Sequence, residues 1–210
     1  MYSGGQDNTI KLWNIVDTTY VDTLYLFRGR FILRYGHETL ITSLSGQRSN
    51  VSSHNNTRII SSSTDNSLRL WKIEANTQMV YRGRKLDQSI ECCAMASYQH
   101  FVTGDINGSV SLYSADKKKS IYSVKVGVRC GTDVQNAHGV DSSGKSVNLT
   151  GGRWVVSCNT LPFTNVLATG SYDDCIRLWD VNPTNREKDG ELLKQVNCIP
   201  AVGVDGGGEV

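Results

Sequence analysis

The chain has 210 residues, of which 39% are hydrophobic and 20% are charged, and its formal net charge is +2. This balance suits a soluble globular protein with a buried core. No run approaches the roughly 20 consecutive apolar residues of a membrane helix, so we expect no membrane span. The small net charge does not by itself indicate a nucleic-acid partner, so any such contact needs a local basic patch. The six cysteines lack the Cys-x-x-Cys spacing of common zinc sites.

A short pattern occurs four times along the chain. Each copy has small residues, then a polar turn pair, and then an alternating segment that closes on an aromatic residue. The copies close at Trp13, Trp71, Tyr113 and Trp179, which are separated by 58, 42 and 66 residues. Self-similarity of this kind is the signature of a repeat architecture.

Each copy predicts a β-hairpin. The turn pairs contain Asn, Asp or Gly, which tolerate the positive φ angles of tight turns, and they are Asp7-Asn8, Asp65-Asn66, Asn107-Gly108 and Asp173-Asp174. After the turn, a period of two places the aliphatic residues on one face and the basic residue with the Trp on the other. Further strands are expected between the copies, in chain order at 19–26, 40–44, 77–81, 89–96, 153–161 and 191–198. Helical periodicity is absent throughout.

The four copies resemble the WD repeat of β-propellers, which implies an all-β fold built from blades of four antiparallel strands. Such a blade takes about 40–45 residues, so the longer intervals contain loop insertions, expected at about residues 25–35, 46–57 and 139–152. Residues 1–210 are predicted to form a single domain of about three complete blades and part of another. Propellers close with typically four to eight blades, so we expect part of a larger, seven-bladed propeller. A gene model that clips or retains segments is the alternative.

The resemblance also implies a polar network inside the blades. In WD repeats a His from an upstream Gly-His pair bonds the turn Asp, and a Ser or Thr and the Trp complete the set. The implied members are His37, Ser63, Asp65 and Trp71 in the second blade and His138, Ser171, Asp173 and Trp179 in the fourth. The third copy has Gly83-Arg84, Asn107 and Tyr113 at these places, so the resemblance does not carry the network over to it. A His near an Asp and a Ser also occurs in catalytic triads, but the repeated position favours a structural role.

Three longer segments go beyond the generic repeat, and they are residues 14–24, 137–139 with 154–171, and 191–203. Together they resemble the WD-repeat subunit of the U3 small nucleolar ribonucleoprotein, the U3 RNA-interacting protein family. The resemblance implies a non-enzymatic scaffold of the nucleolus, within the nucleus, that binds U3 small nucleolar RNA (U3 snoRNA) and proteins of the small-subunit processome. It would assist early processing of the ribosomal RNA precursor. Neither a cofactor, a metal, a catalytic residue nor a small-molecule substrate is implied.

Two sets of residues are candidate partner contacts. The residue before each turn acid projects toward one rim of a propeller, and these residues are Gln6, Thr64, Ile106 and Tyr172. Tyr172 is favoured because aromatic side chains often anchor partners. Phosphate neutralisation needs clustered Lys and Arg. The sequence has three such clusters, of which the one in a loop between blades is favoured, and they are Arg82, Arg84 and Lys85 in that loop, Arg28, Arg30 and Arg34, and Lys117, Lys118 and Lys119. A protein-only WD adaptor, such as a ubiquitin-ligase receptor or a signalling scaffold without RNA contact, remains the alternative.

Overall fold

The computed structural model describes twelve segments of the chain, which are residues 1–23, 36–47, 57–73, 75, 77–83, 89–126, 138–140, 146–148, 154–161, 164–173, 175–183 and 192–200. The regular elements of these segments are β-strands, which confirms the predicted all-β fold. In the same segments, no helix is long and apolar enough to cross a membrane.

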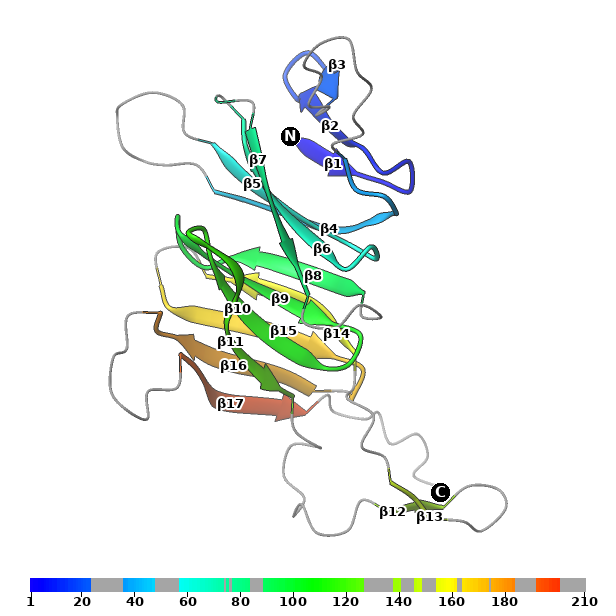
Figure 1. The fold of residues 1–210 in the computed structure, drawn as a ribbon, viewed down its shortest axis with the longest axis vertical. Coiled ribbons are helices and arrows are strands. Elements are labelled where there is room, and N and C mark those ends of the chain that lie inside the picture. Colours follow the sequence, from blue (N-terminus) through cyan, green and yellow to red (C-terminus); the bar gives the residue numbers. More distant parts are fainter. Residues whose placement is uncertain are drawn as a thin grey trace, which may run out of the picture.

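Four antiparallel sheets follow one another along the long axis of the molecule (Figure 1). The first contains β1 (Tyr2–Gly4), β2 (Ile10–Asn14) and β3 (Thr19–Thr23). The second contains β4 (Ile41–Gln47), β5 (Arg58–Ser63), β6 (Ser67–Lys72) and β7 (Thr77–Arg82). The third contains β8 (Ile90–Met95), β9 (His100–Asp105), β10 (Ser109–Ser114) and β11 (Lys117–Lys125). The fourth contains β14 (Val155–Thr160), β15 (Val166–Ser171), β16 (Cys175–Val181) and β17 (Leu193–Pro200).

The sheets are arranged as blades around a common inner line. Strands pair in sequence order within each sheet, so every connection between neighbours is a simple antiparallel one. The first strands contact one another from sheet to sheet, β1 with β4, β4 with β8, and β8 with β14. At the outer edge, β7 contacts β11 and β11 contacts β17. This geometry is the predicted propeller arrangement, with the second, third and fourth sheets as complete blades. The separate hairpin of β12 (His138–Val140) and β13 (Ser146–Asn148) is not part of a blade.

The hydrophobic cores lie between neighbouring blades, because each strand sends alternate side chains to opposite faces of its sheet. In β6, Leu68 and Leu70 are fully buried between the second and third blades. They pack in one cluster with Tyr81 of β7 and Phe101 of β9. Trp71 points the other way and packs with a cluster of isoleucines from the first two sheets. The third and fourth blades bury a further cluster that contains Val110, Leu112, Val155, Leu167 and Trp179. Each blade therefore depends on the next for its core.

The turns have the backbone geometry that their sequences predict. Asn8 and Asn66 have φ angles of 61° and 58°, and Gly108 has a φ of 75°. These values lie in the left-handed region that Asn and Gly adopt most readily. Each of the three residues lies in the turn between the two strands of a hairpin, so the turn residues predicted from the sequence fix the register of the blades.

Two features differ from the sequence prediction. The outer strand of the third blade, β11, was not predicted, and neither was the β12–β13 hairpin. The expected insertions at about residues 25–35, 46–57 and 139–152 lie largely outside the described residues, so they stay predictions.

Candidate functional site

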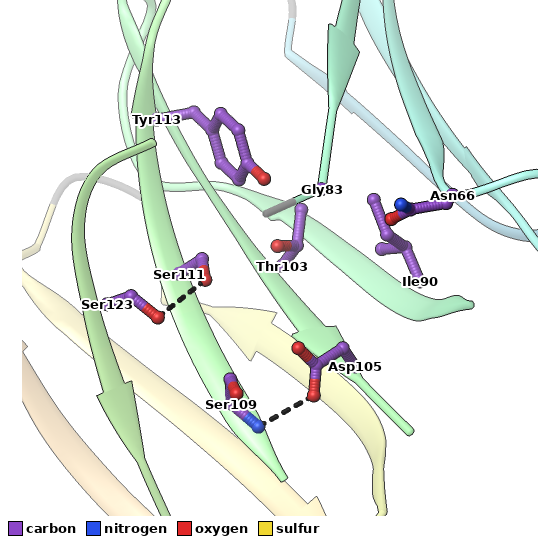
Figure 2. Close-up of a pocket in the computed structure, with 9 residues that line it drawn as sticks. All are labelled: Asn66, Gly83, Ile90, Thr103, Asp105, Ser109, Ser111, Tyr113 and Ser123. Carbon is purple, nitrogen blue, oxygen red and sulfur yellow. Dashed lines mark hydrogen bonds between the residues drawn. The ribbon is translucent and has the colours of Figure 1, made fainter. Parts of the chain in front are cut away.

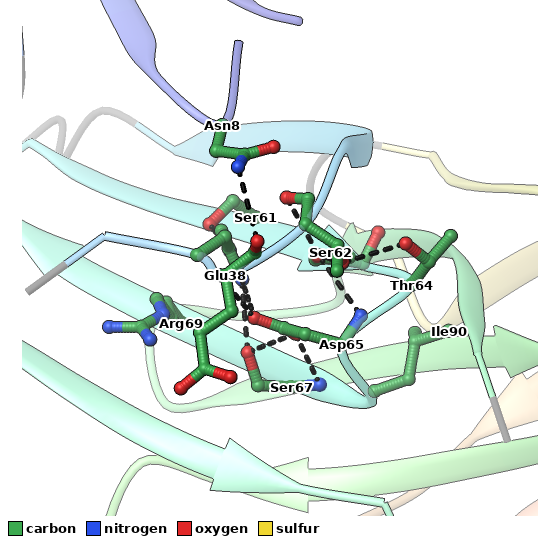
Figure 3. A network of polar contacts seen from close by, with 12 residues as sticks. Asn8, Glu38, Ser61, Ser62, Thr64, Asp65, Ser67, Arg69 and Ile90 are labelled. Carbon is green, nitrogen blue, oxygen red and sulfur yellow. Dashed lines mark hydrogen bonds and ion pairs between the residues drawn. The ribbon is translucent and has the colours of Figure 1, made fainter. Parts of the chain in front are cut away.

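A buried polar network joins the upstream segment of the second blade to its hairpin turn (Figure 3). Asp65 accepts a hydrogen bond from the backbone N–H of Ser67 at 2.8 Å and another from that of Glu38 at 3.0 Å. The imidazole Nδ1 of His37 lies 3.2 Å from Asp65 Oδ2, and the His37 side chain is completely buried. Burial alone would raise the pKa of Asp65, but the hydrogen bonds from His37, Ser67 and the Glu38 amide outweigh it and lower that pKa well below its usual range.

Ser61 links this network to the closing Trp. Its Oγ lies 2.7 Å from His37 Nε2, and Trp71 Nε1 donates a hydrogen bond to the same atom at 2.8 Å. The resemblance had placed Ser63 here, but Ser63 instead lies 2.9 Å from Thr39 Oγ1. The reason is geometric: Trp71 lies opposite Ile59 in the ladder, so the indole reaches the diagonal neighbour Ser61. Ser63 lies one pleat further along β5.

The same link recurs in the first sheet and in the fourth blade with a constant spacing. Trp13 Nε1 donates to Ser3 Oγ at 2.7 Å, and Trp179 Nε1 donates to Thr169 Oγ1 at 2.8 Å. In each case the hydroxyl lies ten residues before the Trp. Thr169, rather than the predicted Ser171, therefore occupies this position in the fourth blade. In all three sheets the hydroxyl therefore lies four residues before the turn Asp and ten before the Trp, whereas the predicted Ser63 and Ser171 lie two residues too far along the strand.

The fourth blade neutralises its turn acid in another way. The two terminal nitrogens of the Arg177 guanidinium donate to the two carboxylate oxygens of Asp173, Nη1 to Oδ1 at 3.0 Å and Nη2 to Oδ2. The two residues are nearly fully buried, with 2% of Arg177 and 5% of Asp173 exposed. The structure does not describe the side chain of His138, the predicted partner of Asp173. A bidentate Arg–carboxylate pair fixes the turn more rigidly than a single hydrogen bond does.

A small polar cavity lies between the second blade and the third, which lacks the Gly-His pair and the Trp (Figure 2). Its volume is about 30 Å³, which is room for a single water molecule or two. The lining residues are Asn66, Gly83, Ile90, Thr103, Asp105, Ser109, Ser111, Tyr113 and Ser123. Asp105 accepts hydrogen bonds from the backbone N–H groups of Asn107 at 2.9 Å and Ser109 at 2.8 Å, so it caps the turn here in place of the Asp65 equivalent, Asn107. Burial raises the pKa of Asp105. The cavity is too small for an organic ligand.

The candidate rim residues differ in exposure. Gln6 and Tyr172 are exposed, whereas Thr64 and Ile106 are half-buried. Tyr172 is 72% exposed, and its ring meets that of Trp154 edge-on at 5.6 Å between centroids. The backbone N–H of Tyr172 donates to the carbonyl oxygen of Trp154 at 2.9 Å. Trp154 was not predicted as a site residue, although an aromatic side chain just before an inner strand was a visible signal.

The basic candidates fall partly within the described chain. Arg82 ends β7 and is exposed, whereas Arg84 and Lys85 lie outside the described residues. Arg82 borders a groove of about 750 Å³ that Lys118 and Lys119 of the next blade also line. In the part of the chain that the structure describes, no group of three or more His, Cys, Asp or Glu side chains is placed to hold a metal ion.

The repeats, the blades and the hydroxyl-to-Trp links together define the fold as a WD40-type β-propeller. The family model described as "WD domain, G-beta repeat" matches residues 29–72 and 144–180. The solved structure titled "Crystal structure of RRP9 WD40 repeats" superposes with a TM-score of 0.68 at 27% identity, covering 96% of this chain and 50% of that chain. The chain therefore corresponds to part of a larger propeller, as the repeat count predicts.

Relatives by sequence have names from the same group. The "U3 snoRNP-associated protein-like EMB2271" of Arabidopsis thaliana is 27% identical over 184 residues, covering 86% of this chain and 32% of the relative. "Ribosomal RNA-processing protein 9" of Saccharomyces cerevisiae is 27% identical over 122 residues, covering 54% of this chain and 21% of the relative. The chain thus spans a third or less of the length of these curated relatives. The protein carries WD40 repeats and resembles the U3 small nucleolar RNA-interacting WD-repeat proteins.

Proposed function

We propose that the protein is a non-enzymatic assembly platform of the U3 small nucleolar ribonucleoprotein (U3 snoRNP). In this role it binds U3 snoRNA, contacts processome proteins in the nucleolus and assists early processing of the small-subunit ribosomal RNA precursor. The single observation that carries the proposal is the superposition of 96% of the chain on the RRP9 WD40 repeats at 27% identity. The names of the plant and yeast relatives support the same assignment.

The described residues fit a binding role. The polar groups of His37, Asp65 and Ser61 form hydrogen bonds with one another and with Trp71, and these bonds stabilise the second blade. Exposed aromatic and basic side chains, by contrast, lie on turns and outer edges, where a partner reaches them. A platform acts by presenting such surfaces on a rigid scaffold.

The test is recovery of RNA with the tagged protein from cells that express it. U3 snoRNA should be enriched over an unrelated small nucleolar RNA, and depletion of the protein should raise the level of unprocessed small-subunit precursor. Ultraviolet crosslinking followed by sequencing of the attached RNA identifies direct contacts. Absence of U3 enrichment, with the protein soluble and folded, would refute the proposal.

The second candidate function is a WD40 adaptor that binds only proteins, such as a ubiquitin-ligase receptor or a signalling scaffold. The observation that favours it is the exposed aromatic pair of Tyr172 and Trp154, because aromatic residues dominate the energetics of protein interfaces. Under this alternative, Tyr172→Ala removes a protein partner from the purified complex, and no small nucleolar RNA is recovered with the wild-type protein.

A further inference from the structure

A groove lies between the outer edges of the second and third blades, and the charged residues that line it are all cationic. The groove has a volume of about 750 Å³ and is lined by Arg69, Val80, Arg82, Gly83, Lys118, Lys119 and Ser120. Four of these seven residues are cationic and none is acidic. Arg82, Lys118 and Lys119 are exposed, and within the described chain no carboxylate forms a salt bridge with any of the three.

An irregularity of the edge strand places the lysines there. In the ladder between β10 and β11, Leu112 pairs with Tyr122 and Ser114 pairs with Lys117. One residue of β10 therefore lies opposite four of β11, so the segment that contains Lys118 and Lys119 bulges out of the ladder. A bulge bends its strand and re-aims side chains. Because β11 contacts β7, the bulged segment lies beside the edge that ends at Arg82.

The floor of the groove is already charged. Arg69 is only 9% exposed, and its guanidinium donates to Gln78 Oε1 at 3.1 Å. Burial lowers the pKa of Arg69, the carboxylates of Asp65 and Glu38 act against this shift, and the positive charge of Arg82 makes a smaller contribution that lowers the pKa. A bound polyanion offsets the electrostatic repulsion between cations that face one another across a groove.

We propose that this groove binds the phosphate backbone of RNA, an inference that rests on the proposed function and assigns it a surface. Protein interfaces have apolar and aromatic centres, but the only apolar side chain in this lining is Val80. The flexible side chains of Lys and Arg can contact the phosphates of an RNA backbone, and such contacts do not depend on the base sequence.

The test compares two triple variants of the full chain by fluorescence anisotropy with a labelled U3 transcript over a salt series. The groove variant is Arg82→Gln/Lys118→Gln/Lys119→Gln, and all three of its positions are exposed. The matched control, Lys72→Gln/Lys125→Gln/Lys194→Gln, removes the same charge elsewhere. We expect the groove variant to lower the slope of log K against log salt by about 2–3, since each lost phosphate contact lowers it by nearly one. The control should keep most of the slope.

Recovery of U3 from cells, run in parallel, separates the two proposals. Equal slopes for the two triple variants would overturn the groove assignment, and the proposed function would stand if the wild type still enriches U3. Failure of the wild type to enrich U3, with a slope that still drops in the groove variant, would overturn the proposed function and leave an RNA-binding groove. Loss of a protein partner with undiminished RNA binding would overturn the assignment in favour of an acidic peptide.

Discussion

The hydroxyl that links His37 to Trp71 gives the sharpest stability prediction. Ser61 is fully buried, and Trp71 is 4% exposed, so the Ser61→Ala variant leaves the indole N–H without its acceptor in a dry site. An unsatisfied buried donor costs about 1–3 kcal/mol, and loss of the bond to His37 adds about 1 kcal/mol. We therefore expect the free energy of unfolding to fall by about 2–4 kcal/mol. In a chain of this size, that lowers Tm by roughly 5–15 °C.

The assay is urea unfolding followed by circular dichroism, which does not depend on the number of tryptophans. Ser61→Thr is the matched control because it keeps the hydroxyl, and Thr169 holds the same position in the fourth blade. A double-mutant cycle with Trp71→Phe isolates the link, since Ser61→Ala should cost less when the indole donor is already gone. If the two effects add within about 0.5 kcal/mol, the hydroxyl and the indole are not coupled and the reasoning is refuted.

Three other positions give independent outcomes. Gly104→Ala should destabilise the protein by about 1–3 kcal/mol, because the added Cβ would lie 2.5 Å from the buried Cγ1 of Val155; an unchanged urea midpoint would mean that the blades separate easily. Asp173→Asn should cost about 3–5 kcal/mol because Arg177 stays buried without its carboxylate, and a milder loss would show that water reaches the guanidinium. Burial raises the pKa of Tyr81 from 10.0 to about 12, so its contribution to stability is complete below pH 10 and is lost between pH 10 and 12. Tyr81→Phe should flatten that part of the stability profile, and an identical profile would contradict the assignment.

Much of the fold was predictable because its signals are local. Asn and Gly at the hairpin turns have positive φ, and the Leu68-Arg69-Leu70-Trp71 alternation divides between two cores as a period of two requires. The strand β11 was missed because its first three residues are lysines, which hide the alternation that follows. A run of charge looks like a solvated turn until a neighbouring edge is known.

The site was less predictable for a physical reason. Ser61 and Ser63 are two residues apart on one strand, so they share a face, and sequence alone does not decide which of them the indole reaches. The sequence prediction also left the third turn without an acid, because Asn107 stands where the other copies have Asp, and it did not identify Asp105 as the residue that caps this turn. Which side chains form these contacts depends on the strand register and on diagonal distances between paired strands, and both are set by the folded structure rather than by the local sequence.

The buried networks and the exposed groove represent different uses of the same repeat. In the second blade His37 and Trp71 are joined through Ser61, whereas the third blade has Tyr113 in place of the Trp and borders a water-sized cavity. The third blade is nonetheless held by its neighbours, because its cores are shared with the blades on either side. A blade whose stability comes from its flanks tolerates an irregular outer edge, and it is this blade that carries the bulge with Lys118 and Lys119. Lys118 and Lys119 lie outside both of these cores, so a charged surface on this edge does not disturb the packing that holds the blade.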